Sequence, residues 1–329
     1  MTTVGVSFTR WRAESLGLDY QRTFRRIREM GFNLIRLSAS WREIEEFGYQ
    51  HLDWLMAEAE RTGQRVLLTV GMKALGWPEF YLPQRLVPDA PFGTDLARGP
   101  LVTTTLAFVR EVVLRYRVRT CLTAWQIENE PFNRSGPQGW WIARRLVAAE
   151  ARLVRSLDPR PVAVTAFAHF NDGMDRASSR FQSKWLRRLG LDLPAEREAL
   201  ATLRRDDILG LDVYRAIGWS RTAEEQEVAR AEDDQFDHVR AWRRITRDQG
   251  KRLWITEAQA EPWEASARTR DNPLSVRPAD MVDLATQLTA LEVEALMLWG
   301  GEYWIWREQS GDPRWIESAS RVLKSVLIS

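Results

Sequence analysis

Short apolar runs alternate with amphipathic stretches along the whole of this 329-residue chain. The short runs are apolar almost throughout, which is typical of strands that are buried on both faces of a parallel sheet. Eight segments have this pattern: residues 3–8, 33–38, 65–70, 122–127, 161–166, 208–213, 252–256 and 293–299. We therefore expect a parallel sheet of eight strands.

Helical periodicity fills the segments between these runs. In residues 140–157, for example, Ile142, Leu146 and Leu153 recur at helical spacing and lie on one apolar face. Glycine or proline follows several of the segments and predicts where each helix ends. The expected helices are residues 19–30, 50–61, 101–117, 140–157, 236–249, 278–291 and 313–327, together with a charged helical stretch that ends near residue 205.

Eight strand–helix units in one chain predict an α/β fold, a single (β/α)₈ TIM barrel. The competing architecture, a doubly wound open sheet, is expected to carry a glycine-rich phosphate turn after its first strand. Residues 8–12 contain no glycine. No linker divides the chain, so we expect residues 1–329 to form one catalytic domain, with long loops at the C-terminal face of the strands.

Composition narrows the classes of function. The 47 basic and 45 acidic residues leave a net charge of +2, so we expect no nucleic-acid partner. No apolar run reaches about 18 residues, so we expect no membrane-spanning segment. Residues 1–6 lack the pattern of a signal peptide, which favours a cytoplasmic protein unless a leader was removed. The 16 tryptophans favour flat, half-apolar ligands such as sugar rings.

Carboxylates and tryptophans dominate the positions at and just beyond the expected strand ends, which face one shared cleft in a barrel. These positions are Arg36, Trp41, Lys73, Trp77, Glu79, Glu128, Asn129, Glu130, His169, Asp212, Tyr214, Glu257, Gln259, Glu261, Trp263, Trp299, Glu302 and Trp304. Two of the three histidines fall in expected helices, so we expect no zinc site. The chain also lacks a G-x-S-x-G motif and a phosphate-binding glycine loop.

Two of the carboxylates end strands that face each other across the expected barrel, Glu130 after the fourth strand and Glu257 at the seventh. Glycoside hydrolysis requires a carboxylic acid at the leaving oxygen and a carboxylate at the anomeric carbon. Stereochemistry is retained when the two groups lie roughly 5–5.5 Å apart. This chemistry needs no metal or organic cofactor. Glu128 competes with Glu130 for the role of the acid.

The motifs around both carboxylates resemble those of the clan A retaining glycoside hydrolases. Residues 124–131, Ala-Trp-Gln-Ile-Glu-Asn-Glu-Pro, are similar to the strand-four motif of the clan, and residues 253–257, Leu-Trp-Ile-Thr-Glu, to its strand-seven nucleophile motif. The ends of strands two, six and eight resemble the clan as well, at Arg36, Tyr214 and Trp299. The resemblance spans the chain and is to cellulase-type family 5 proteins and, in the Gln-Ile-Glu-Asn-Glu string, to clan A β-galactosidases.

This resemblance implies cleavage of β-glycosidic bonds in oligo- or polysaccharides by double displacement, with Glu130 as the acid/base and Glu257 as the nucleophile. The other matching residues would support this pair or contact the sugar: Asn129 would bind the 2-hydroxyl, Arg36 would keep Glu257 charged, Tyr214 would donate a hydrogen bond to Glu257, and Trp299 would lie under the sugar ring.

The chain departs from the clan after strands three and six, where many members carry a histidine and this chain has Lys73 and Arg215. These departures leave the sugar open. Further expected substrate contacts are Trp41, Lys73, Trp77, Glu79, Gln259, Glu302 and Trp304. Two alternatives to a hydrolase remain: a transglycosylase that uses the same pair, and a carbohydrate-binding barrel that has lost catalysis.

Overall fold

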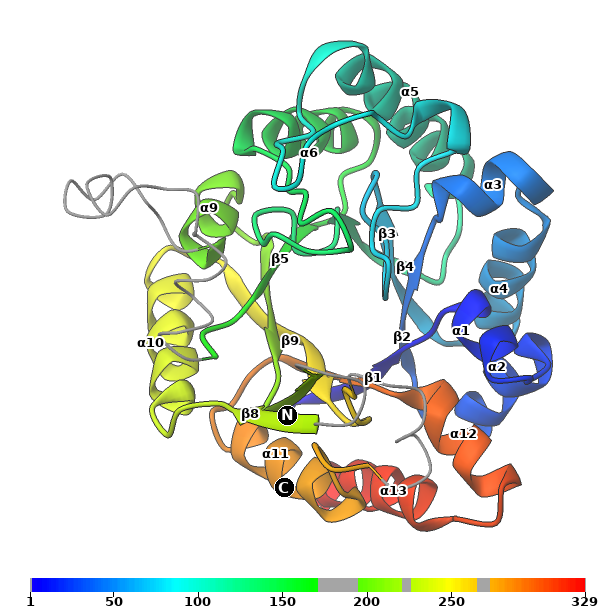
Figure 1. The fold of residues 1–329 in the computed structure, drawn as a ribbon, viewed down its shortest axis with the longest axis vertical. Helices are drawn as coiled ribbons and strands as arrows, with labels where there is room; N and C mark the ends of the chain where they lie inside the picture. Colours follow the sequence, from blue (N-terminus) through cyan, green and yellow to red (C-terminus); the bar gives the residue numbers. More distant parts are fainter. Residues whose placement is uncertain (1, 171–194, 221–225, 265–272, 329) are drawn as a thin grey trace.

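The computed structural model describes residues 2–170, 195–220, 226–264 and 273–328. Eight parallel strands close into a barrel in the order β1-β10-β9-β6-β5-β4-β3-β2 (Figure 1), which confirms the expected (β/α)₈ fold. The barrel strands are β1 (Thr3–Ser7), β2 (Leu34–Ser38), β3 (Arg65–Val70), β4 (Leu122–Ile127), β5 (Val162–Phe167), β6 (Ile208–Val213), β9 (Arg252–Gln259) and β10 (Ala295–Trp299).

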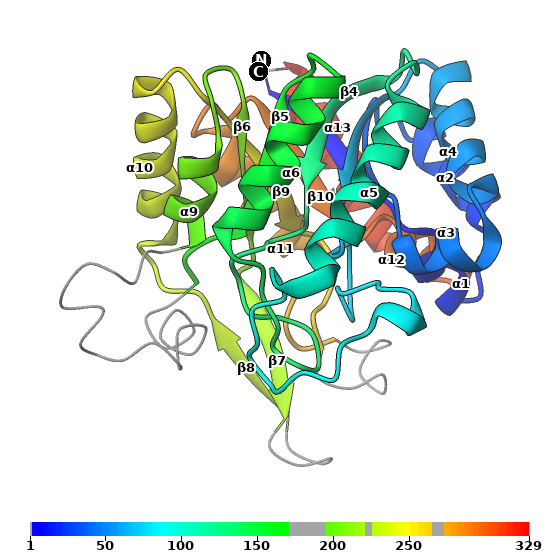
Figure 2. The same cartoon turned by 90° about the horizontal axis from the view of Figure 1, so that it is seen from above.

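Helices surround the barrel, and an antiparallel hairpin of β7 (Ala216–Ser220) and β8 (Gln226–Arg230) projects from the end opposite the chain termini (Figure 2). None of the described helices is long and apolar enough to cross a membrane. The helices are α1 (Arg10–Ser15), α2 (Tyr20–Glu29), α3 (Trp41–Phe47), α4 (Gln50–Arg61), η1 (Gln84–Leu86), α5 (Gly99–Tyr116), α6 (Arg144–Leu157), α9 (Ala195–Thr202), α10 (Gln235–Asp248), α11 (Pro278–Thr289), α12 (Gly301–Gln309) and α13 (Arg314–Ile328).

The helix α2 illustrates how the sequence forms the outer layer. The side chain of Asp19 accepts a hydrogen bond from the Arg22 backbone N–H at 2.8 Å and caps the first turn. Phe24 and Ile27 are fully buried in the core that helices and strands share. Gly31 follows the end of the helix with φ at 107°, a conformation that glycine adopts without a steric cost.

The structure differs from the expected elements mainly in the loops. The short helices α1, α3 and α12 and the β7–β8 hairpin were not expected, because each is too short to show a clear period. The helix expected at 140–157 begins only at Arg144, since Trp140 and Trp141 instead pair with Ser135 and Asp95 in isolated bridges. Of the expected charged helical stretch, residues 171–194 lie outside the described residues and its last part is α9.

The barrel interior has an apolar floor beneath a polar layer. The floor is one buried cluster of Leu34, Leu67, Ala124, Ala163, Ile208, Trp254, Ala295 and Met297. Because side chains of a strand alternate between its two faces, the next inward positions lie one layer higher. They carry the buried polar residues Arg36, Thr69, Gln126, Thr165 and Thr256.

Gly210 occupies the same polar layer on β6. A Cβ atom there would lie 2.6 Å from Thr256 Oγ1 and 2.7 Å from Thr165 Cγ2, so the position has no room for a side chain. The strands therefore approach closely at this level, and the polar layer forms a packed base for the residues at the strand ends.

Candidate active site

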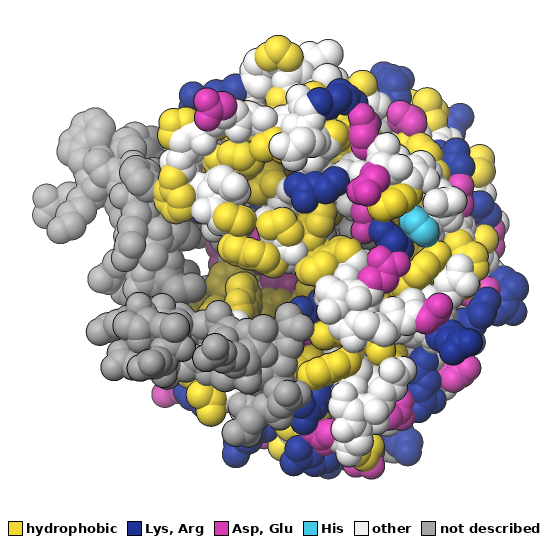
Figure 3. All heavy atoms as spheres, turned by 45° about the vertical axis from the view of Figure 1, so that its right-hand side comes forward, with side chains coloured by type: hydrophobic (Ala, Val, Ile, Leu, Met, Phe, Trp, Pro, Cys, Tyr) yellow, Lys and Arg dark blue, Asp and Glu magenta, His cyan; other side chains and the backbone are white. Residues whose placement is uncertain are grey.

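A cavity of about 490 Å³ lies at the C-terminal ends of the barrel strands, and its volume is typical of small-ligand sites. Figure 3 shows a hollow in the surface of the molecule in which acidic and apolar side chains are visible. Nine of the eighteen strand-end positions expected at the cleft line the cavity: Trp77, Glu79, Asn129, Glu130, Tyr214, Glu257, Glu261, Trp263 and Trp299. Six other expected site residues are buried and do not line the cavity: Arg36, Trp41, Lys73, Gln259, Glu302 and Trp304.

Glu257 on β9 has a different donor at each carboxylate oxygen. Arg36 Nη1 lies 2.6 Å from Oε1, and Tyr214 Oη donates a hydrogen bond to Oε2 at 2.7 Å. Glu257 is 5% exposed, and that exposure faces the cavity. An ion pair and a charge-assisted hydrogen bond both favour an anionic carboxylate in a fixed orientation.

The guanidinium of Arg36 is fully buried and connects three parts of the site. Besides Glu257, it donates to Gln126 Oε1 at 2.7 Å and to Asn129 Oδ1 at 2.5 Å. Because Arg36 occupies the amide oxygen of Asn129, the amide nitrogen of Asn129 remains to donate into the cavity. Gln126 also donates to the Glu128 carbonyl at 2.8 Å. We did not expect this role of Gln126, although a polar residue inside an apolar strand was the signal for it.

Glu130 has surroundings opposite to those of Glu257. Burial raises the pKa of its carboxyl well above the usual range, and the negative charges of Asp212 and Glu79 raise it further. Lys73 opposes this effect only in part. The backbone of Glu130 has φ at 43°, and its N–H donates to Thr165 Oγ1 at 2.9 Å. The carboxyl therefore faces the cavity in its protonated form.

Asp212 at the end of β6 forms a pair with Glu130. The two buried carboxyl groups are electrostatically coupled, and Thr256 Oγ1 donates to Asp212 Oδ1 at 2.6 Å. Burial raises the pKa of Asp212 to about 8, and the charge of Glu257 raises it as well. Two neighbouring buried carboxyls keep one proton between them, because two negative charges so close together would repel each other strongly. The sequence placed Asp212 at a strand end but did not predict this pairing.

Glu128, the alternative acid, is fully buried and does not line the cavity. Its carboxylate accepts hydrogen bonds from the backbone N–H groups of Met72 at 3.0 Å and Lys73 at 2.6 Å. A Cβ at Gly71 would lie 2.2 Å from its carboxyl carbon, so only glycine leaves room for this contact. Burial raises the pKa of Glu128 to about 7, and the buried carboxyl of Glu150 is electrostatically coupled to it. Glu128 therefore holds a loop in place, and Glu130 faces the cavity.

Aromatic side chains and an ion pair form the outer wall of the cavity. Trp299 Nε1 donates to Glu261 Oε1 at 3.0 Å, and Arg12 Nη2 lies 2.8 Å from both oxygens of Glu261. Arg12 belongs to the unexpected helix α1 and was not among the expected site residues. Trp77 and Trp263 line the same cavity with 57% and 39% of their surfaces exposed. Such exposed indole faces suit a sugar ring.

Two tryptophans that we expected to contact substrate are core residues. Trp304 is fully buried, donates from Nε1 to the Ala260 carbonyl at 2.7 Å and packs on Phe32. The expectation that Trp304 faces the cleft was wrong, because α12 begins at Gly301 and carries Trp304 back against the barrel. Trp41 begins α3 and stacks on Phe108 with ring centroids 4.6 Å apart.

Three expected polar contacts support loop backbones instead of lining the cavity. Lys73 Nζ donates to the Glu130 carbonyl at 2.7 Å and lies 3.1 Å from Glu79 Oε2. Gln259 Oε1 accepts hydrogen bonds from the backbone of Arg215 at 2.8 Å and Ala216 at 3.0 Å. Glu302 accepts one from the Thr9 backbone at 2.5 Å. These side chains fix the loops that carry the site.

A group of residues with metal-ligand chemistry lies outside the cavity lining. The structure brings His169, Asp234 and His238 together, although the sequence predicted no zinc site. The two histidines are far apart along the chain, and the loop after β5 and helix α10 bring them into contact. Their spacing in the sequence carried no signal of this.

The sequence matches no protein-family model and no curated protein. The fold, in contrast, is similar to solved structures. A polyextremophilic β-galactosidase from Halorubrum lacusprofundi has a TM-score of 0.55 at 16% identity, over 91% of this chain and 52% of that one. A β-glucosidase from Exiguobacterium marinum has a TM-score of 0.55 at 13% identity, over 91% and 89%. A GH5_18 protein from Streptomyces cattleya, in complex with GlcNAc, has a TM-score of 0.55 at 13% identity, over 91% and 70%.

These TM-scores show a shared fold, and the low identities show no more than that. The chain has the (β/α)₈ barrel that β-galactosidases, β-glucosidases and a family 5 glycoside hydrolase also have. It spans about half the length of the β-galactosidases from Halorubrum lacusprofundi and Rahnella, covering 52% and 50% of those chains.

Proposed function

We propose that this protein is a retaining glycoside hydrolase that cleaves β-glycosidic bonds of oligo- or polysaccharides, with Glu257 as the nucleophile and Glu130 as the acid/base. The opposite surroundings of two carboxyls in one cavity carry this proposal. Glu257 is bound by Arg36 and Tyr214, whereas burial and neighbouring negative charges raise the pKa of Glu130. A nucleophile has to be charged and a general acid protonated, so the two environments match the two roles.

The reaction takes two steps in this arrangement. In the first, the Glu257 carboxylate attacks the anomeric carbon, the glycosidic bond breaks, and Glu130 gives its proton to the leaving oxygen. In the second, Glu130 takes a proton from water, the water oxygen attacks the anomeric carbon, and the bond to Glu257 breaks. One water molecule is consumed, and both carboxyls return to their starting forms.

Neighbouring residues support both steps. The Asn129 amide nitrogen is free of the bond that Arg36 makes to its oxygen, so it is positioned to donate to the sugar 2-hydroxyl. Trp299 offers its face as a platform at the point of cleavage, held by its bond to Glu261. The charge of Asp212 raises the pKa of Glu130 and favours return of the proton after the second step. The similarity of the fold to known glycosidases supports the same conclusion.

The charges around the cavity favour an uncharged sugar. Glu79, Glu261 and Glu264 line the cavity in addition to the catalytic pair. Among the described lining residues, Arg12 is the one cation, and both oxygens of Glu261 already bind it. A uronic acid would bring a further negative charge to these carboxylates without a cation to receive it.

The test is the mass of the intact protein after incubation with activated 2-deoxy-2-fluoro glycosides of the gluco, manno, galacto and xylo series. The fluorine slows the second step, so a glycosyl-enzyme accumulates. We expect the mass of one sugar on Glu257 with at least one member of the series, and none in Glu257→Gln. Glu58→Gln is the matched control, because Glu58 is a buried, arginine-paired glutamate on α4, and it should label as the parent does.

Two outcomes would overturn the proposal. One is a label that maps to another residue or persists in Glu257→Gln. The other is binding of natural oligosaccharides without turnover or label, the behaviour of a carbohydrate-binding barrel. Analysis of the products from a natural oligosaccharide then separates a hydrolase, which releases shortened sugars, from a transglycosylase, which also forms longer ones.

A further inference from the structure

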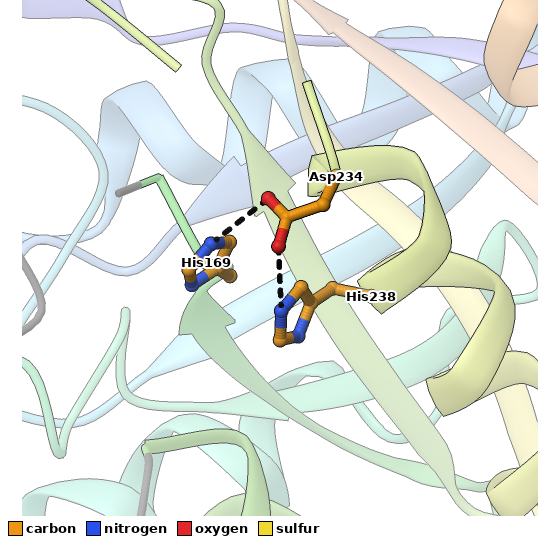
Figure 4. Close-up of side chains that lie close together, drawn as sticks. All are labelled: His169, Asp234 and His238. Atoms are coloured by element: carbon orange, nitrogen blue, oxygen red, sulfur yellow. Dashed lines mark ion pairs between the residues drawn. The ribbon is translucent and has the colours of Figure 1, made fainter. Parts of the chain in front are cut away.

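A second cluster of ionisable side chains lies where the loop after β5 meets the start of α10. His169 follows β5, and Asp234 and His238 lie one helical turn apart at the N-terminal end of α10. One ligand atom of each residue lies within 4.8 Å of the others. Figure 4 shows the Asp234 carboxylate with one oxygen directed at a nitrogen of each imidazole ring. We propose that these three residues bind a divalent transition-metal ion of the Zn²⁺ type.

Two distances in this cluster, each to a different oxygen of Asp234, are close to the ligand separations of a coordination shell. His169 Nε2 lies 3.4 Å from Asp234 Oδ1, and His238 Nε2 lies 3.6 Å from Asp234 Oδ2. Hydrogen bonds from nitrogen to oxygen are usually about 2.7–3.2 Å long. Ligand atoms that each lie about 2.0–2.1 Å from a tetrahedral ion are separated by about 3.4 Å. Glu232 Oε2 lies 3.6 Å from His169 Nε2 but outside the group of three, so water completes the coordination shell.

The backbone around the cluster is held in place by other residues. Gln235 Nε2 donates to the carbonyls of His169 at 2.8 Å and Tyr214 at 3.0 Å. The backbone N–H of Glu232 donates to the Phe170 carbonyl at 3.0 Å. The loop after β5 and the start of α10 are therefore already joined, so a metal ion binds ligands whose main chains are positioned beforehand.

The donor types select the class of ion. Imidazole nitrogen together with carboxylate oxygen suits Zn²⁺, Co²⁺ or Ni²⁺, whereas Mg²⁺ and Ca²⁺ prefer oxygen ligands alone. The rings of His169 and His238 are stacked with centroids 4.0 Å apart, so one ring has to turn for both lone pairs to point at one ion. The side chain of His238 is 46% exposed on the surface of α10 and has the space to turn. The side chain of His169, 10% exposed, is the fixed ligand.

A bound ion would join the loop after β5 to α10 on the outer side of the active-site wall. Gln235, which anchors this junction, also holds the Tyr214 carbonyl, and Tyr214 donates to Glu257. The metal site therefore stabilises the fold next to the cavity and takes no part in bond cleavage. The site does not depend on the proposed glycosidase activity, because its ligands are all outside the cavity lining.

The experiment is a titration of the metal-free, full-length protein with Co²⁺, followed by visible absorption, and then by displacement with Zn²⁺. We expect one ion per chain, with the intense visible bands of a four- or five-coordinate site, and loss of these bands when Zn²⁺ is added. Asp234→Asn and His238→Gln should each weaken binding at least tenfold, an effect that even changes to supporting residues commonly produce. Both positions are exposed on α10, so the variants should keep the fold, as circular dichroism checks.

His51→Gln is the matched control, because His51 is the remaining histidine, lies on α4 and contacts Tyr20 of α2. It should bind Co²⁺ as the parent does. In a second measurement, Zn²⁺ should raise the Tm of the parent and of His51→Gln but not that of His238→Gln. Equal Co²⁺ affinity of the parent and both ligand variants, loss of binding in His51→Gln, or the absence of any saturable binding would each overturn the site.

Discussion

The carboxyl pair of Asp212 and Glu130 allows a sharp test of how the general acid keeps its proton. Burial raises the pKa of Glu130 first, and the charge of Asp212 is the next contribution. Replacing Asp212 by asparagine removes that charge but keeps the size of the side chain. The amide also donates a hydrogen bond, which favours the charged form of Glu130. Both changes lower the pKa of Glu130.

The size of the shift follows from the electrostatic coupling of the two groups. Two charges about 4 Å apart, a separation typical of neighbouring carboxyls, interact by about 4 kcal/mol at an effective dielectric constant of about 20. One pKa unit is equivalent to about 1.4 kcal/mol, so about 3 units is an upper bound. The partner carboxyl, with a pKa of about 8, carries its full charge only at alkaline pH. We therefore expect the basic limb of the pH profile to move down by about 1–3 units.

The assay is kcat/KM as a function of pH for an aryl β-glycoside with a poor leaving group, whose cleavage depends on the acid. Asp207→Asn is the matched control, because Asp207 is a buried aspartate that precedes the same strand at its opposite end. Its basic limb should coincide with that of the parent. A basic limb of Asp212→Asn that stays in place or moves to higher pH would refute the argument.

Two further predictions concern single carboxyls. Glu130→Ala should slow glycosides with poor leaving groups far more than activated aryl glycosides, because good leaving groups need little protonation; equal losses of kcat/KM on both would exclude Glu130 as the acid. Burial raises the pKa of Glu302 to about 7, so its contribution to the free energy of unfolding is greatest below the ordinary value of 4.5 and is lost as the pH rises to 7. Glu302→Gln keeps an acceptor for the Thr9 N–H and should be more stable than the parent at pH 8 by up to about 3 kcal/mol, with no such gain near pH 4. Urea unfolding at both pH values measures this, and a difference that does not change with pH would contradict it.

The fold was predictable because parallel strands that are buried on both faces require nearly continuous apolar runs in the sequence. Segments such as Arg65–Val70 and Leu122–Ile127 have the expected bounds, because one face of each strand is buried in the barrel interior and the other against the helices. The strand ends then follow, and with them the positions of Glu130 and Glu257 at one face. The same pattern predicts the roles of side chains less well, because the end of a strand fixes the position of a residue but not the direction of its side chain.

Trp304 and Lys73 illustrate this limit. Both follow strand ends closely in the sequence, yet both are fully buried. Trp304 is buried because α12 begins immediately beyond β10. Lys73 is buried because its ammonium group binds Glu79 and the Glu130 carbonyl. Arg12 was missed for the opposite reason. Its helix α1 is six residues long, and only contact with Glu261 gives the side chain a place at the cavity.

The polar layer of the barrel links the stability of the fold to the geometry of the site. A barrel held by packing alone would carry apolar residues at this level, as it does in the floor below. Here Arg36 joins Gln126, Asn129 and Glu257, and Thr256 joins Asp212, so bonds between side chains cross the barrel from β2 to β4 and β9 and from β9 to β6. Loss of one partner leaves the others buried and unsatisfied, which costs about 1–3 kcal/mol for each group. The same bonds orient the nucleophile and the amide beside it, so a change that weakens this layer disturbs folding and catalysis together.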